Sequence, residues 1–236
     1  MKSFWDWMIF NMSEKLTTLR PELIAEWHPL KNGLLKPLDV APYSHKKCWW
    51  VCPQGHEYLA IVEHRTKGSG CPYCSNHKIL SGFNDLATLR PDVLREWAWD
   101  LNTDVLPNLI AQQSSKVVWW RCEHGHEYKM KVAIKVGNGY GCPICSGKRV
   151  LEGYNDLASQ RPDLAEQWDM DRNGLLTPQL VTCGSHKKVW WLCEREHSWS
   201  MPVRNRTTQN QGCPFCSGKK VWPGFNDFAT RHPELV

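Results

Sequence analysis

The sequence repeats itself every 70 to 71 residues. The repeated text includes LTTLRPEL, LATLRPDV, LASQRPDL and FATRHPEL, then WWVC, WWRC and WWLC, then GCPYCS, GCPICS and GCPFCS. A fixed internal period means that one small folding unit recurs along the chain, instead of one large core formed from distant segments. We therefore expect a tandem array of small modules.

The period divides the chain into three complete modules, at residues 16–85, 86–156 and 157–227. Residues 1–15 are expected to form an N-terminal tail. Its apolar start either docks on the first module or precedes a true initiator at Met12. Residues 228–236 open a fourth copy that stops before any metal ligand, so this segment is either a cut repeat or a cap on the third module.

Each module is expected to combine a short helix with a β-hairpin, which gives a small α+β unit with helical connectors. The predicted helix begins at a proline followed by an acidic residue, as in Pro91 and Asp92, and ends at a tryptophan, which is Trp97 in the same module. The hairpin is predicted because apolar and polar residues alternate from the two adjacent tryptophans of each module onward; we call these two residues the Trp pair. In the second module this alternation predicts that Tyr128, Met130, Val132 and Ile134 point inward, and that Lys129, Lys131 and Lys135 point outward.

Three cysteines and one histidine recur in every module as C-x3-H followed by C-x2-C. Structural Zn²⁺ takes four tetrahedral thiolate and imidazole ligands, and two ligand pairs separated by a hairpin supply that geometry. We therefore predict three structural zinc ions. The ligands are Cys52, His56, Cys71 and Cys74 in the first module, Cys122, His126, Cys142 and Cys145 in the second, and Cys193, His197, Cys213 and Cys216 in the third.

Two rival interpretations of the cysteines are weaker. Disulfides would leave one aligned cysteine of each module unpaired within that module. A catalytic zinc keeps an open position for water, whereas four protein ligands are available here. The deaminase signature H-x-E also fails, because Glu57 is adjacent to His56 and its counterpart in the third module is Ser198. We therefore expect that the chain is not an enzyme and takes no small-molecule substrate.

The remaining features favour a cytoplasmic protein that does not enter a membrane. Mean hydropathy is −0.51, and no stretch approaches the roughly 20 apolar residues that span a bilayer. Cys48 and Cys183 align with non-cysteine residues in the other modules, so they are not ligands. Free thiols without an export signal are typical of a reducing compartment.

The motifs WWxCxxGH and GCPxCSxK, with the GxNDLAxxRP link, resemble a bacterial family of tandem zinc-ribbon or treble-clef zinc-finger repeats. The resemblance covers residues 16–236 and implies the twelve ligands named above. It also implies an accessory nucleic-acid-binding role in a bacterium or phage, with a nuclease of the very-short-patch-repair type or another effector supplied by a partner. One departure is Glu196, which stands where the first two modules have Gly55 and Gly125.

Positive charge is concentrated around the metal motifs. Residues 45–79, 115–150 and 186–221 contain 19 Lys and Arg against 6 Asp and Glu, while the rest of the chain contains 10 against 18. Basic modules joined by acidic connectors are typical of a protein that follows phosphates, so the favoured partner is nucleic acid, and DNA in particular. The alternative is a zinc-stabilised protein-interaction scaffold.

The basic side chains predicted to contact phosphates recur at similar places in the modules. Their alternative role is that of ordinary solvated residues. They are Lys46, Lys47, Arg65 and Lys78 in the first module, Lys116, Lys129, Lys131, Lys135, Lys148 and Arg149 in the second, and Lys187, Lys188, Arg204, Arg206, Lys219 and Lys220 in the third.

Tryptophan is abundant, with 14 residues. In each Trp pair one ring is expected to enter the core while the other covers a neighbour, although an exposed ring could also stack on an unpaired base. Trp99 and Trp222 have no counterpart in every module and are expected to make surface or linker contacts.

Overall fold

A computed structural model describes residues 15–235 of the chain. The predicted N-terminal tail, apart from Lys15, lies outside these residues. By its contacts the chain divides into two units, one of residues up to 95 with 102–116 and one of residues 96–101 with 117 onward.

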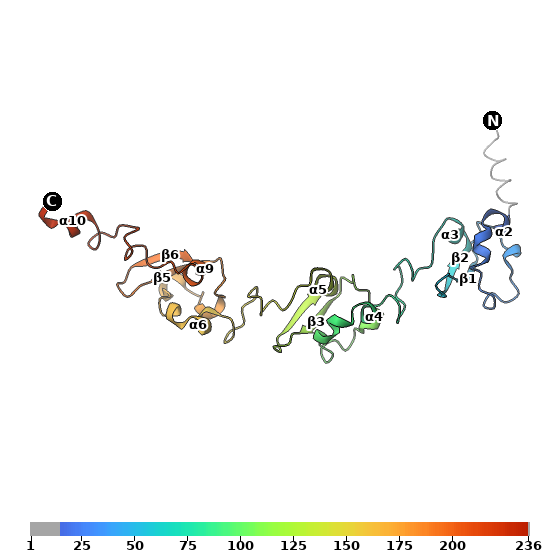
Figure 1. The fold of residues 1–236 in the computed structure, drawn as a ribbon, viewed down its shortest axis with the longest axis horizontal. Coiled ribbons are helices and arrows are strands. Elements are labelled where there is room, and N and C mark those ends of the chain that lie inside the picture. The colour runs from blue at the N-terminus through green and yellow to red at the C-terminus, as the bar shows by residue number, and fades with distance from the viewer. Residues whose placement is uncertain (1–14, 236) are drawn as a thin grey trace, which may run out of the picture. The chain divides into compact units, whose positions relative to one another are not determined.

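Every module contains one antiparallel two-stranded sheet, whose strands are drawn as arrows in Figure 1. The strand pairs are β1 (Lys47–Val51) with β2 (Glu57–Ile61), β3 (Val117–Arg121) with β4 (Glu127–Lys131), and β5 (Lys188–Leu192) with β6 (Ser198–Pro202). The register is the same in all three, with Trp50 opposite Tyr58, Trp120 opposite Tyr128 and Trp191 opposite Trp199.

A short helix follows each hairpin directly. These helices are α3 (Val62–Thr66), α5 (Val132–Asn138) and α9 (Val203–Thr207). The predicted second strand of the middle module was therefore too long, because the chain turns into a helix at Val132. The change from a two-residue to a 3.6-residue period moves Lys135 from the outer face to the interior.

Several short helices precede each hairpin. They are α2 (Leu16–Leu19), η1 (Pro21–Ile24) and η2 (Pro37–Asp39) in the first module, α4 (Leu86–Leu89), η3 (Pro91–Glu96) and η4 (Pro107–Leu109) in the second, and α6 (Leu157–Gln160), α7 (Pro162–Ala165), α8 (Met170–Asn173) and η5 (Pro178–Leu180) in the third. One in each module begins at the predicted proline, but in the first and third modules it ends at Ile24 and Ala165, before the tryptophan to which the predicted helix ran. Asp85 and Asp156 cap α4 and α6 by accepting from the backbone N–H of Thr88 and Ser159.

The core of each module is built on the Trp pair. Trp50, Trp120 and Trp191 are fully buried, and each indole Nε1 donates to a carbonyl on the partner strand. A second tryptophan packs edge-on against each of them, with ring centroids 5.2 to 5.5 Å apart. Edge-to-face pairs add about 0.5–1.5 kcal/mol beyond burial. The prediction that one Trp of each pair enters the core is confirmed.

The fourth repeat segment forms α10 (Phe228–Arg231) and η6 (Pro233–Leu235), with Asp227 as the helix cap. Phe228 is 63 % exposed, whereas its counterparts Leu16, Leu86 and Leu157 are fully buried. The segment therefore does not bury the side chain that its counterparts bury. No helix within residues 15–235 is long and apolar enough to cross a bilayer.

Candidate metal centres

The first centre is formed by two turns. Cys52 follows β1 and His56 precedes β2, so the hairpin turn presents this pair on one side, while Cys71 and Cys74 lie in the turn after α3. His56 Nδ1 lies 3.4 Å from Cys52 Sγ, 3.7 Å from Cys71 Sγ and 3.2 Å from Cys74 Sγ, and the Cys52 and Cys74 sulfurs are 3.7 Å apart.

These distances fit a zinc ion. A tetrahedral centre with Zn–S of about 2.3 Å and Zn–N of about 2.0–2.1 Å has S···S edges of about 3.8 Å and S···N edges of about 3.6 Å. The sulfurs are also too far apart for a disulfide, whose S–S bond is about 2.05 Å. The donor set and its spacing therefore match a structural Cys₃His zinc site, with Nδ1 as the imidazole ligand.

The other two centres have the same dimensions. In both, S···N distances are 3.2 to 3.8 Å and the measured S···S distance is 3.8 Å. In each of the three centres all four ligand atoms lie within 4.8 Å of one another. The twelve predicted ligands thus gather into three sets of four. Cys48 and Cys183 lie in or against the hydrophobic cores and belong to none of these sets.

Crowding of the sulfurs gives a reason for a cation at each centre. Loss of solvent and the neighbouring cysteine sulfurs raise the pKa of Cys74 and of Cys145 to about 12, and that of Cys216 to about 11. Three thiolates this close repel one another, and a divalent cation removes the repulsion. The three sites therefore take three structural zinc ions.

Comparison with known proteins agrees with this geometry. Residues 23–77, 93–148 and 164–219 each match the family described as "Probable Treble clef zinc finger domain". The chain belongs to this treble-clef zinc-finger family. No curated protein matches the sequence. The three matched segments contain all twelve ligands, so each treble-clef module holds one complete centre.

A tight turn joins the first two ligands of each treble-clef module. The backbone N–H at the position before the histidine donates to the carbonyl of the first cysteine, at 2.8 to 2.9 Å. Gly55 and Gly125 adopt φ of 81° and 80° there, and Glu196 takes the same left-handed region with φ of 61°. Replacement of glycine in the third module therefore keeps the turn but places a non-glycine residue in a costly conformation.

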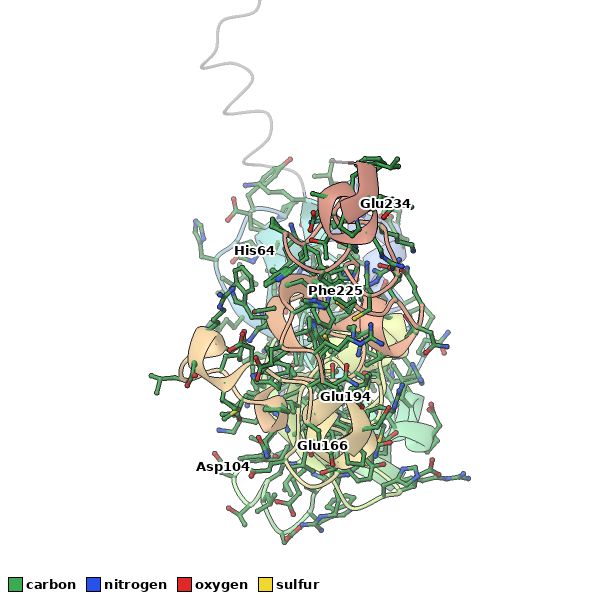
Figure 2. The ribbon with its side chains drawn as sticks, turned by 90° about the vertical axis from the view of Figure 1, so that its left-hand side faces the viewer. His64, Asp104, Glu166, Glu194, Phe225 and Glu234 are labelled. Atoms are coloured by element: carbon green, nitrogen blue, oxygen red, sulfur yellow. The ribbon has the colours of Figure 1, made fainter. Side chains whose placement is uncertain are left out.

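An aromatic ring covers each ligand histidine. Phe83, Tyr154 and Phe225 have ring centroids 4.1 to 4.5 Å from His56, His126 and His197 in turn; Phe225 is labelled in Figure 2. These rings come from the G-[FY]-N-D link, which sequence reasoning treated as a connector. The recurrence of that text after every last cysteine was the signal that could have identified it as part of the centre.

The asparagine of the same link ties it to the second ligand turn. Asn84 Nδ2 donates to the carbonyls of Tyr73 and Lys78, and Asn155 and Asn226 make the equivalent bonds in the other modules. Trp222 also packs on His197, with centroids 5.0 Å apart. Trp222 was expected to make a surface or linker contact, and from the link segment its ring packs on the third zinc centre. Trp99 is 57 % exposed, as expected.

The second module has an additional imidazole beside its centre. His124 Nδ1 lies 3.6 Å from Cys145 Sγ, and its ring is stacked on that of His126 with centroids 6.2 Å apart. The same position is Gln54 in the first module and Arg195 in the third. The S···N distance equals the edge of a zinc tetrahedron, so His124 lies within reach of a ligand position.

Three of the predicted phosphate contacts lie inside the modules. Arg65, Lys135 and Arg206 are only 4, 6 and 7 % exposed. Each is the fourth residue of its helix, α3, α5 or α9, and its side chain is buried in the module. The prediction that these three residues contact phosphate was therefore wrong, because a buried cation paired within the fold cannot reach a nucleic acid.

Each buried cation has an internal partner. Arg65 donates to Glu26 at 2.5 Å, and Lys135 donates to Glu96 at 2.7 Å. Tyr128 OH also donates to Glu96, at 2.8 Å, so carboxylate, phenol and ammonium form one buried network. Burial raises the pKa of the Tyr128 phenol well above its ordinary range, which keeps this group protonated as a donor.

In the third module the same position is built differently. Arg206 donates to the side-chain amide oxygen of Gln167 and to the carbonyl of Gln211. Trp199 replaces the tyrosine, and its buried indole N–H has no hydrogen-bond partner among residues 15–235. Here the buried guanidinium has an amide where the first two modules have a carboxylate.

The other predicted basic side chains reach the surface. Arg204 is half-buried, with its guanidinium 3.1 to 3.2 Å from the His186 ring nitrogens. Lys129 lies over the Trp119 ring, and Lys148 over that of Tyr140. The exposed set consists of Lys46, Lys47, Lys78, Lys116, Lys129, Lys131, Lys148, Arg149, Lys187, Lys188, Lys219 and Lys220.

Proposed function

We propose that this protein is a non-enzymatic nucleic-acid-binding protein, with DNA as the favoured ligand, and that its treble-clef modules contact phosphates through exposed lysine and arginine side chains. The observation that carries the proposal is a basic groove in the first module. Lys47 and Lys78, which are 31 residues apart in the sequence, line this one groove. It has a volume of about 340 Å³.

The groove lies between the outer edge of the hairpin and the second ligand turn. Lys47 comes from β1, His64 from α3 and Lys78 from the segment after Cys74; His64 is labelled in Figure 2. Leu59, Ala60, Ile61, Ser69, Gly70 and Pro72 complete the lining. None of these residues is acidic, so the groove presents only positive or neutral groups to a ligand.

The aligned positions of the other two modules keep this character. None of the nine aligned residues in either module is acidic, although the chain as a whole has 24 Asp and Glu. The basic residues at these positions are Lys129, Lys131 and Arg149 in the second module and Lys188 and Lys220 in the third. Repetition of a basic, acid-free surface in three modules supports successive contacts along a phosphate backbone.

The chemistry of the centres supports a binding role over catalysis. Each zinc site has four protein ligands, and a hydrolytic zinc site keeps one position for water or substrate. Any cutting of nucleic acid would then come from a nuclease or another effector protein that the modules bring to it. The free thiol of Cys48 favours action in a reducing compartment such as the cytoplasm.

The test is the salt dependence of binding, measured by fluorescence anisotropy with labelled DNA and RNA oligonucleotides. Six or seven phosphate contacts predict a loss of about a thousandfold in affinity between about 50 mM and 200 mM salt. An affinity that does not change over this range, or no binding at low salt, would contradict the proposal.

One observation favours a protein partner instead. Leu34 and Leu175 occupy equivalent positions in the first and third modules, and both side chains are 96 % exposed. Apolar side chains held in solvent at a repeated position suit a protein contact. A purified complex that survives nuclease treatment and is lost in the Leu34→Ser, Leu175→Ser double variant would support this second function.

A further inference from the structure

Apolar side chains line the groove of the first module together with its two lysines. We call Leu59, Ile61 and Pro72 its apolar floor, and Leu59 is 44 % exposed. Phosphate binding alone requires cations and gains nothing from apolar side chains. An unpaired base offers an apolar face as well as a phosphate, whereas a duplex hides its base faces in the stack. The composition of the groove therefore matches a strand with an unstacked base.

The second module adds an aromatic ring at an aligned groove position. Tyr140, which stands where the first module has Ser69, is 44 % exposed. The ammonium of Lys148 lies 4.3 Å from the centre of its ring. An exposed ring next to a cation is the pair of groups with which single-strand-binding proteins hold a base and its phosphate. Two modules thus combine an apolar or aromatic surface with positive charge.

The size of the groove sets the size of the group that enters it. Its volume of about 340 Å³ is near the lower end of the range for small-ligand sites, about 300–1,000 Å³. A groove of this size suits one nucleotide-sized group.

The secondary structure lacks an element suited to a duplex groove. Within residues 15–235 the longest α-helix is α5, with seven residues, and its lysine is buried. The hairpins are short, and Glu57, Glu127 and Glu194 lie at or near their zinc-bearing ends. Readers of duplex DNA place a helix or β-ribbon with basic side chains in the major groove, and acidic groups there would repel the phosphates.

We infer that the nucleic acid bound by this protein is a single strand, with one unpaired nucleotide in the groove of each module. The inference rests on the proposed function and narrows its ligand. In the first module Lys47 and Lys78 hold the phosphates on either side of a base that covers Leu59 and Ile61. The aligned residues vary this arrangement. In the second module Val117 stands at the Lys47 position and Lys129 and Lys131 at the Leu59 and Ile61 positions, so the ring of Tyr140 faces the base and Arg149 replaces Lys78. The third module keeps both cations, as Lys188 and Lys220, with Ser200 and Pro202 at the positions of Leu59 and Ile61.

The experiment compares a labelled single strand of mixed sequence with the duplex of the same sequence, at the same salt, on the full zinc-loaded chain. We expect tighter binding of the single strand. Equal or tighter binding of the duplex would overturn the inference while leaving the proposed function intact. No binding of either would remove both.

Two variants locate the contact. Lys47→Glu with Lys78→Glu removes two phosphate contacts, so single-strand affinity should fall by roughly tenfold and the salt slope by about 1.4. The matched control is Lys15→Glu with Lys36→Glu, which changes one exposed lysine directly before the first module and one within it, neither of which lines the groove. Equal losses in the two double variants would show non-specific attraction and overturn the assignment of the groove.

The variant Leu59→Ser separates the base from the phosphate. It leaves the charge unchanged and alters an exposed side chain, so the module should keep its zinc. We expect single-strand affinity to fall severalfold with an unchanged salt slope. Unchanged affinity in this variant, with zinc retained, would show that no base covers the apolar floor.

Discussion

The first two modules and the third reach the same zinc geometry with different interiors. Glu26 and Glu96 give a carboxylate to the buried cation, whereas Gln167 gives an amide to Arg206. The ligand distances nevertheless agree to within a few tenths of an ångström in all three centres. The metal centre thus does not depend on a buried ion pair beside it.

The hairpin turns of these regions also differ. The first two modules use glycine at the left-handed position, and the third uses Glu196. The module with the amide partner therefore also carries the strained turn. Zinc binding contributes on the order of 10 kcal/mol per small module, which exceeds the few kcal/mol at stake in either difference. We conclude that zinc binding makes these departures of the third module tolerable.

The largest expected effect is loss of a zinc ion. His197→Ala removes the one histidine that, within residues 15–235, lies among the ligands of the third centre, so that module should lose its metal and unfold. His126→Ala should keep its metal, because His124 Nδ1 lies 3.6 Å from Cys145 Sγ and can supply the fourth ligand. Native mass spectrometry should count two zinc ions per chain for His197→Ala and three for His126→Ala.

The control for this comparison is the double variant His124→Ala with His126→Ala, which should bind two ions. Two ions in the single variant His126→Ala would show that His124 cannot replace the lost ligand. The third module would then no longer differ from the second in this respect.

The sequence was sufficient for the ligands but not for the side chains around them. Spacing within each repeat identifies all twelve ligands, since a structural zinc site needs four donors from two close pairs. It did not reveal that Arg65, Lys135 and Arg206 are buried, because charged residues are normally exposed and the switch from strand to helix at Val132 has no strong signal. The role of Phe83 was missed because its partner His56 lies 27 residues earlier.

The next effect concerns the buried ion pair. Glu26→Gln gives the first module the amide of the third and leaves Arg65 without a carboxylate. Breaking a buried ion pair costs about 3–5 kcal/mol of stability. We expect the first module to lose about 2–3 kcal/mol, because the Glu26 side chain is 23 % exposed. Chelator-dependent alkylation of Cys52, Cys71 and Cys74, followed by peptide mass spectrometry, should become faster in this module alone.

A matched variant tests whether the lost charge at this site is the cause. Glu22→Gln removes a carboxylate that pairs with Arg20 at the surface of the same module. Surface pairs contribute little to stability, so alkylation rates should not change. If both variants accelerate alkylation equally, the pair of Glu26 and Arg65 contributes no more than a surface pair. The exchange of carboxylate for amide in the third module would then have no effect on stability.

The reverse substitution should strengthen the third module by a smaller amount. Gln167→Glu places a carboxylate next to the guanidinium of Arg206, and a hydrogen bond between charged groups contributes about 1.5–3 kcal/mol. The gain is expected at the lower end, because the Trp199 N–H makes no hydrogen bond to the Gln167 oxygen that the new carboxylate replaces, whereas Tyr128 donates to Glu96. Alkylation of Cys193, Cys213 and Cys216 should slow, and faster alkylation would contradict the prediction.

The smallest effect belongs to the turn. Glu196→Gly relieves the left-handed backbone at φ of 61° and should stabilise the third module by about 1 kcal/mol. Gly55→Ala should destabilise the first by a similar amount, and since a Cβ there would meet no atom within 4 Å, only the backbone conformation is altered. If Glu196→Gly slows alkylation in the third module and Gly55→Ala speeds it in the first by a similar factor, Glu196 destabilises its module only through its backbone conformation. A loss of stability in Glu196→Gly would instead mean that the glutamate makes a compensating contribution of its own.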